Sequence, residues 1–176
     1  MSSSRSRFKQ APYTGPAWQT AALYLALALI AQVEFLHYFT FHDATFSPVL
    51  ILVVWYAIVT DLRRAAIFGL CAGLAEDILA ASTGGAWTIS TTLTAILASL
   101  LSRGFFADSI PLVGTIVAFA TVARNLIFWA VMQAEGYPSG LGMLHFHQAL
   151  WQALLNVVLV AGGMAVLRLR NARRLR

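Results

Sequence analysis

The sequence predicts an all-α, polytopic membrane protein that folds as one bundle of six transmembrane helices. Three observations lead to this prediction: an apolar composition, six long apolar runs, and basic residues confined to alternate connections. Hydrophobic residues make up 59% of the 176 residues and charged residues 11%, with a mean hydropathy of +0.73. Soluble domains carry about 25% charged residues. A water-soluble fold with so few charges would expose large apolar patches, whereas a bundle that faces lipid can present them.

The apolar runs are bounded by charged residues, Pro or Gly, and a membrane span needs about 20 residues. The second run is shorter than this, so we expect it to tilt, to thin the bilayer locally, or to extend back toward Phe41. The first run could instead be a signal peptide, because Arg5, Arg7 and Lys9 precede an Ala/Leu stretch. A second span follows at once without a clear cleavage site, which favours a retained span. The six runs are 18–37, 46–60, 65–81, 86–102, 109–133 and 145–167.

The orientation follows from the distribution of Lys and Arg, which accumulate in cytoplasmic connections. With the N-terminus inside, the cytoplasmic segments hold eleven of the twelve basic residues: Arg5, Arg7, Lys9, Arg63, Arg64, Arg103, Arg168, Arg170, Arg173, Arg174 and Arg176. We therefore predict a basic cytoplasmic segment at 1–17, a membrane domain at 18–167 and a basic cytoplasmic tail at 168–176. The charge gathers at the ends of the chain, which indicates a membrane topology and not nucleic-acid binding.

The twelfth basic residue, Arg124, lies inside the fifth run, where an unpaired charge is costly. Glu76 and Asp77 in the third span and Glu34 in the first lie at comparable depth, so these four residues form a predicted intramembrane polar cluster. We expect Arg124 to pair with an acid on the third span, and Asp77 in particular. The alternative is that Arg124 snorkels outward and that water wets the acids from an outer vestibule.

Small residues recur every four positions in the third span, where Gly69 and Gly73 lead onto Asp77. This spacing lines one face of a helix, and a Gly-xxx-Gly pair lets a second backbone approach closely. We therefore predict a helix contact at Gly69 and Gly73. The hydroxyl groups of the fourth span are expected to bond back to carbonyls of their own helix.

The sixth span carries a polar stripe, formed by Gln148, Gln152 and Asn156 with His145 before them. Lipid offers these groups no hydrogen bonds, so the stripe should face the bundle interior or a partner helix. His145 and His147 point to different faces of a helix, so no metal site is predicted. We recognise no catalytic constellation and no cofactor motif, and predict a protein that is not an enzyme. The five Trp residues are interpreted as interfacial anchors.

The third and fourth spans carry a recognisable pattern. The stretch from Ala66 to Gly85, followed by an apolar span that ends at Arg103, resembles the MreD family of bacterial rod shape-determining proteins. The matching residues are Gly69, Gly73, Leu74, Asp77 and a glycine at Gly84 or Gly85, and Pro48 before a span with Trp55 and Tyr56 also fits. Two features depart from the family pattern: no basic residue precedes Pro48, and Glu76 adds a second acid beside Asp77.

The resemblance implies a non-enzymatic inner-membrane scaffold of the cell-elongation machinery, which controls rod shape and peptidoglycan synthesis. Its implied partners are an MreC-like protein with one membrane span, the RodA polymerase with its penicillin-binding partner, MreB filaments and membrane lipid. The implied fold is similar to the S components of energy-coupling-factor transporters. A solute-binding component of that kind, with Glu34, Glu76, Asp77, Arg124 and Gln152 around an outer cavity, is the alternative function.

Overall fold

The computed structural model describes residues 15–35, 38, 40–42, 44–81, 84–102 and 110–174. The predicted all-helical architecture is confirmed for this part of the chain, which contains six α-helices in the order expected from the apolar runs. Most of the predicted N-terminal segment 1–17 lies outside the described residues.

The first helical segment is α1 (Trp18–Ile30), which continues directly into a π-helical turn, η1 (Ala31–Phe35). The second helix, α2 (Pro48–Val59), has twelve residues and is about 18 Å long. Its start matches local sequence signals, because Ser47 caps the helix by accepting a hydrogen bond from the Leu50 amide, and Pro48 follows at the first helical position. The helix is apolar throughout and half of its residues are buried, so it forms the centre of the bundle.

The remaining helices are longer, and each begins and ends within three residues of its predicted run except at the C-terminus. The α3 helix is capped by Asp61, whose carboxylate accepts a hydrogen bond from the Arg64 amide at 2.8 Å. The sixth helix runs beyond residue 167, so the predicted tail continues the helix. The bounds are α3 (Leu62–Leu79), α4 (Ala86–Ser102), α5 (Ile110–Ala134), a short 3₁₀ turn η3 (Ser139–Leu141), and α6 (Gly142–Arg174).

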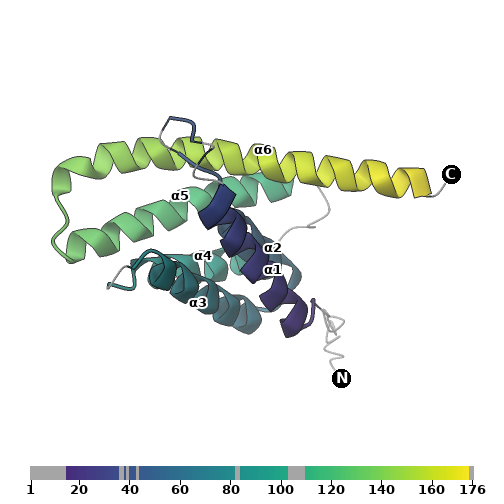
Figure 1. Ribbon diagram of the computed structural model, residues 1–176, viewed down its shortest axis with the longest axis horizontal. Coiled ribbons are helices and arrows are strands. Elements are labelled where there is room, and N and C mark those ends of the chain that lie inside the picture. The colour runs from purple at the N-terminus through teal and green to yellow at the C-terminus, as the bar shows by residue number, and fades with distance from the viewer. Residues whose placement is uncertain are drawn as a thin grey trace, which may run out of the picture.

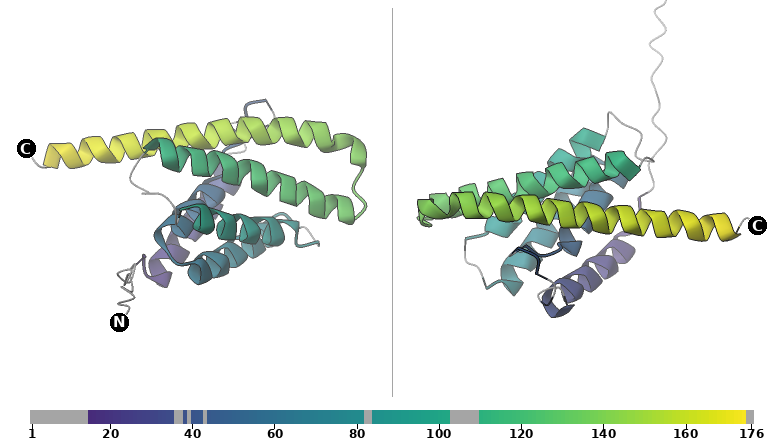
Figure 2. Two further views of the ribbon diagram at one scale, coloured as in Figure 1. Left: turned by 180° about the vertical axis from the view of Figure 1, so that it is seen from behind. Right: turned by 90° about the horizontal axis from the view of Figure 1, so that it is seen from above.

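Two antiparallel pairs of helices, α3 with α4 and α5 with α6, can be followed in Figure 1, and α1 contacts α2. The pair α3 and α4 packs closely, and α4 also contacts α2 and α5. Figure 2 shows α5 and α6 side by side as a long hairpin on one side of the other helices, with the C-terminal turns of α6 extending past them. The α3–α4 and α5–α6 connections lie at one end of the bundle, and both ends of the described chain lie toward the other.

The surface and the interior of the bundle have an unusual distribution of polarity. Glu76, Asp77, Arg124 and Asn156 are buried, together with several Ser and Thr residues. Large apolar side chains are exposed on every helix, including Leu27, Ile78, Leu93, Phe119 and Leu154. By length and composition, α5 from Pro111 to Ala134 and α6 from Gly142 to Arg170 are able to cross a membrane.

Candidate functional site

The centre of the bundle contains an ion pair between Arg124 of α5 and Glu76 of α3. Arg124 Nη2 lies 2.6 Å from Glu76 Oε1, and both side chains are at least 95% buried. The guanidinium group also lies 4.6 Å from the centre of the Trp87 ring, within the range of a cation–π contact. The charge of Arg124 is therefore balanced by one carboxylate and one aromatic face.

Two further polar side chains close this pair into a ring of hydrogen bonds. Arg124 Nη1 donates to Ser47 Oγ at 3.0 Å, and Ser47 Oγ donates to Gln32 Oε1 at 3.3 Å. Gln32 Nε2 then donates to Glu76 Oε1 at 3.1 Å, and the other carboxylate oxygen accepts from Thr91 of α4 at 3.2 Å. The ring joins η1, α3 and α5 with Ser47, the residue that caps α2. We call Gln32, Ser47, Glu76 and Arg124 the polar ring.

The polar stripe of α6 connects to the polar ring through the backbone before α2. Asn156 Oδ1 accepts from the Ser47 amide at 2.9 Å, and its amide group donates to Thr121 of α5 at 3.1 Å. Gln152 donates to the carbonyl of Thr45 at 3.1 Å and accepts from Asn125 at 2.8 Å. These contacts satisfy an irregular stretch of backbone that enters the bundle interior. Gln148, the third residue of the predicted stripe, is half-buried.

Three residues of the polar network lie at a similar depth in helices that run in the same direction. Gln32, Glu76 and Arg124 each lie fourteen residues after the first residue of their own helical segment. At about 1.5 Å per residue, each is about 21 Å from that end. The turn η1, the Ser47 cap of α2 and the helices α3 to α6 all contribute to the network, so it ties the whole bundle together.

Asp77 has a different role from its neighbour Glu76. Its carboxylate accepts hydrogen bonds from the amides of Trp87 and Thr88, at 3.1 and 2.9 Å, and from the Thr88 hydroxyl. These amides belong to the first turn of α4, whose N–H groups have no partner within their own helix. Asp77 thus caps α4 from α3, where the positive end of the helix dipole also favours a carboxylate.

The glycines of α3 make this cap possible. A Cβ atom on Gly73 would lie 2.6 Å from both the Trp87 carbonyl oxygen and the Thr88 Cα, and one on Gly69 would lie 2.6 Å from the Ala95 Cβ. Such distances are well inside van der Waals contact. The helix contact predicted at Gly69 and Gly73 is therefore found within the chain, between α3 and α4.

The expected pairing of Arg124 with Asp77 is wrong, because the structure pairs Arg124 with Glu76. The glycine face does aim Asp77 at a close neighbour, but that neighbour is the start of α4, which offers unpaired amides. Glu34 does not join the cluster, since its side chain is exposed. Arg124 does not snorkel outward either, because it is only 2% exposed.

Three residues of the site were missed from the sequence. Gln32 and Ser47 belong to the polar ring, and Trp87 stacks on Arg124 instead of serving only as an interfacial anchor. A polar residue deep in an apolar run could have revealed Gln32, and the Ser-Pro cap signature could have marked Ser47. In α4, Thr92 bonds back to its own helix as predicted, whereas Thr88 and Thr91 reach α3.

A cavity of about 250 Å³ adjoins the polar ring on one side. Gln32 and Glu76 supply its polar wall, Trp87 an aromatic wall, and apolar residues of α1, η1 and the end of α3 the remainder. Comparison of the chain with protein-family models, curated proteins and solved structures gave no match. Functional assignment therefore depends on this geometry and on the sequence resemblance.

Proposed function

We propose that the chain is a six-span membrane protein with its polar network in the outer half of the bilayer. The observation that supports this is the inverted distribution of polarity: a charged pair and amides inside, and large apolar side chains outside. Water would leave that outer surface unfavourably solvated, whereas lipid solvates it. The charged pair and the interior amides bond to one another, as polar residues within a membrane domain are expected to do.

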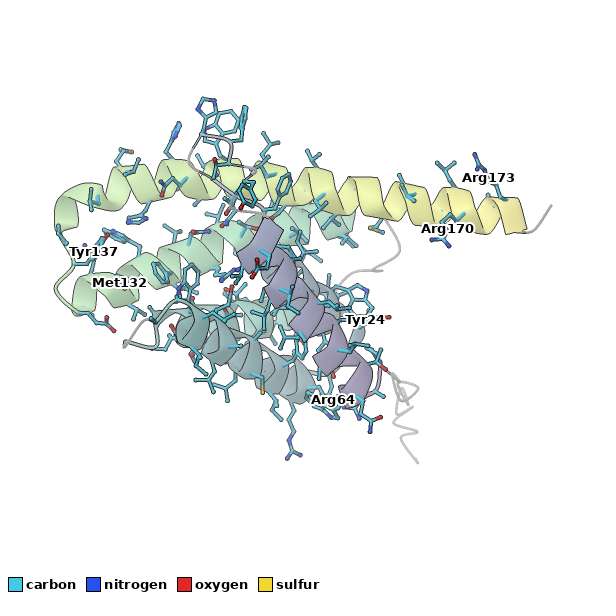
Figure 3. The ribbon with its side chains drawn as sticks, viewed as in Figure 1. Tyr24, Arg64, Met132, Tyr137, Arg170 and Arg173 are labelled. Carbon is cyan, nitrogen blue, oxygen red and sulfur yellow. The ribbon has the colours of Figure 1, made fainter. Side chains whose placement is uncertain are left out.

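We further propose that both termini are cytoplasmic. In Figure 3, the labelled Arg64, Arg170 and Arg173 lie toward one end of the bundle, and Met132 and Tyr137 lie toward the other. Basic side chains at one end favour that end as the cytoplasmic one. The first and last residues that the structure describes lie toward this same end (Figure 1).

The function that the geometry supports best is a non-enzymatic scaffold in the inner membrane of a bacterium. The observation that carries this proposal is that the buried acids, Glu76 and Asp77, contact other helices of the bundle. Glu76 binds Arg124, Gln32 and Thr91, while Asp77 binds the first turn of α4. Groups used in this way hold the bundle in one arrangement and leave its outer surface to contact other membrane proteins.

The resemblance of residues 66–85 to the MreD family gives the scaffold its proposed setting. The family pattern includes Gly73 and Asp77. In this structure both residues contact the start of α4: Gly73 allows α4 to pack closely against α3, and Asp77 caps α4. We propose that the protein assembles with an MreC-like single-span protein in the cell-elongation machinery. The RodA polymerase, its penicillin-binding partner and MreB filaments are the further partners of that proposal.

The solute-binding alternative requires Glu34, Glu76, Asp77, Arg124 and Gln152 to surround one cavity. In this structure only Glu76 of these five lines the cavity beside the polar ring. Asp77 and Gln152 bind other elements, and Glu34 is exposed. This arrangement favours the scaffold over a carrier of charged solutes.

Depletion of the protein in its own bacterium tests the scaffold. Cells that lose the protein should become round, and a copy that carries an affinity tag should restore rod shape and retain an MreC-like protein during purification. Restoration of growth by one vitamin, with cell shape unchanged during depletion, would instead identify a transporter component. The two functions therefore give opposite results in one experiment.

A further inference from the structure

We propose that the cavity beside the polar ring binds the head group of a neutral amphiphile, a lipid-like molecule whose head carries hydroxyl or amide groups. This inference rests on the membrane location proposed above and adds a ligand to the scaffold. Three features carry it: the unused hydrogen-bonding positions of the polar wall, the charge balance of the ring, and the opening of the cavity on the apolar surface.

The polar wall of the cavity still has hydrogen-bonding capacity. Each oxygen of a carboxylate accepts about two hydrogen bonds, and a primary amide donates two. Among the described residues, Glu76 Oε2 accepts one, from Thr91, and Gln32 Nε2 donates one, to Glu76. The cavity therefore presents one acceptor position and one donor position, which match a hydroxyl or an amide group.

The charge of the ring indicates that the ligand is neutral. Glu76 carries one negative charge, and Arg124 at 2.6 Å balances it. A cationic head group would meet the field of Arg124, which lies over the Trp87 ring that also forms a wall of the cavity. An anionic head group would meet the Glu76 carboxylate directly. A neutral hydrogen-bonding group avoids both costs.

The position of the cavity indicates that the ligand comes from the bilayer. Val33 and Leu79 line the cavity and are about half exposed, so the cavity opens on the apolar surface between η1 and the end of α3. In the proposed orientation this end faces the outer leaflet, at the level where lipid head groups begin. A volume of about 250 Å³ is below the usual range for ligand pockets, about 300–1,000 Å³, so it fits a small head group and not a whole lipid.

The local backbone is also distinctive where it borders the cavity. Gln32 and Val33 lie in the π-helical turn η1, the one departure from α-helical geometry in the first segment. Such turns are rare and often occur at functional sites. Here the turn directs Gln32 onto both Glu76 and the Ser47 cap, which fixes its amide at the edge of the cavity.

Equilibrium binding of radiolabelled monoolein tests the proposal on the full chain. The protein is purified in an amine-oxide detergent, whose head group carries no hydroxyl. Monoolein should bind saturably, with about one molecule per chain. Methyl oleate, which has the same chain without the hydroxyl groups, should bind at least about tenfold more weakly, since it has no hydroxyl group to donate to the Glu76 carboxylate.

Variants that fill the cavity without touching the polar ring locate the site. Ala80→Leu should weaken monoolein binding by at least about tenfold, and Val33→Phe is a second such variant if the first does not fold. Ile78→Leu, on a surface residue that is 70% exposed and outside the cavity lining, should bind as the native chain does. Loss of binding in the cavity variants alone supports the proposal.

Three results would overturn it. Equal affinity for methyl oleate would mean that only the acyl chain associates, and unchanged binding by a folded cavity variant would place the site elsewhere. Competition by free glycerol at the concentration of monoolein would identify a soluble ligand and refute the lipid source. None of these results bears on the depletion phenotype or the topology, so failure here differs from failure of the scaffold.

Discussion

Breaking the ion pair between Arg124 and Glu76 should destabilise the bundle strongly from either side. Replacing Glu76 with Gln keeps the size of the side chain but leaves a guanidinium group that is 2% exposed without a counter-charge. Removing one partner of a buried pair typically costs about 3–5 kcal/mol. Arg124→Gln should cost a similar amount, because it also removes the Ser47 hydrogen bond and the stacking on Trp87.

The double substitution should be much milder than the sum of the two. Two neutral amides can bond to each other, so the remaining loss is the Ser47 bond and the Trp87 contact, about 1–3 kcal/mol in total. We expect a coupling free energy of at least about 2 kcal/mol. Polar contacts within membranes are often weaker than the low dielectric suggests, so values near the lower limit are expected. Each single variant should melt about 6–20 °C below the native chain.

Thermal unfolding of the four proteins in detergent measures this cycle. A matched control is the surface pair of Asp61 and Arg64, whose atoms lie 3.9 Å apart and whose side chains are 62% and 42% exposed. Its coupling should stay between about 0 and 1 kcal/mol. Additive effects of Arg124→Gln and Glu76→Gln would refute the assignment. Strong coupling of Arg124→Gln with Asp77→Asn would show that the other acid is the partner.

The remaining predictions concern packing, surface and topology. Gly73→Ala should destabilise the protein by about 1–3 kcal/mol, because its Cβ would overlap the backbone of α4, whereas Gly163→Ala, with open space around it, should be neutral or stabilising by up to about 1 kcal/mol in the same melting assay. Cys71 is exposed on α3, so in intact membranes it should resist a charged maleimide and react after solubilisation in SDS; rapid labelling in membranes would place it in water. A reporter fused after Arg176 should be active in a cytoplasm-dependent assay, and activity that requires export would exclude the proposed orientation with both termini in the cytoplasm.

Hydropathy predicted the helices well because lipid and core positions both favour apolar residues, and charged residues mark the connections. It predicted the bounds of α4 to the residue and those of α5 within one. The second run was harder, since nothing in an apolar sequence distinguishes a complete span from a short helix such as α2, which begins inside the bundle.

The partners in the site were less predictable than its members. Glu76 and Asp77 are adjacent in the sequence and equal in depth, so only the positions of α4 and α5 decide which acid meets Arg124. The position of α4 depends on Gly73, which allows α4 to pack closely against α3. Asp77 then binds the amides in the first turn of α4. Gln32 and Ser47 had no spacing signal, because contacts across 44 and 77 residues arise only from tertiary packing.

The irregular backbone before α2 has a consequence for biosynthesis. The Thr45 carbonyl and the Ser47 amide are satisfied by Gln152 and Asn156, residues that the ribosome adds more than 100 positions later. Until α6 enters the membrane, these groups have no such partners, and unpaired backbone groups are costly in lipid. If the chain spans the membrane as proposed, we expect the first helices to wait at the translocon or near the bilayer surface until synthesis is nearly complete. Chains truncated before α6 should be recognised and degraded by membrane proteases.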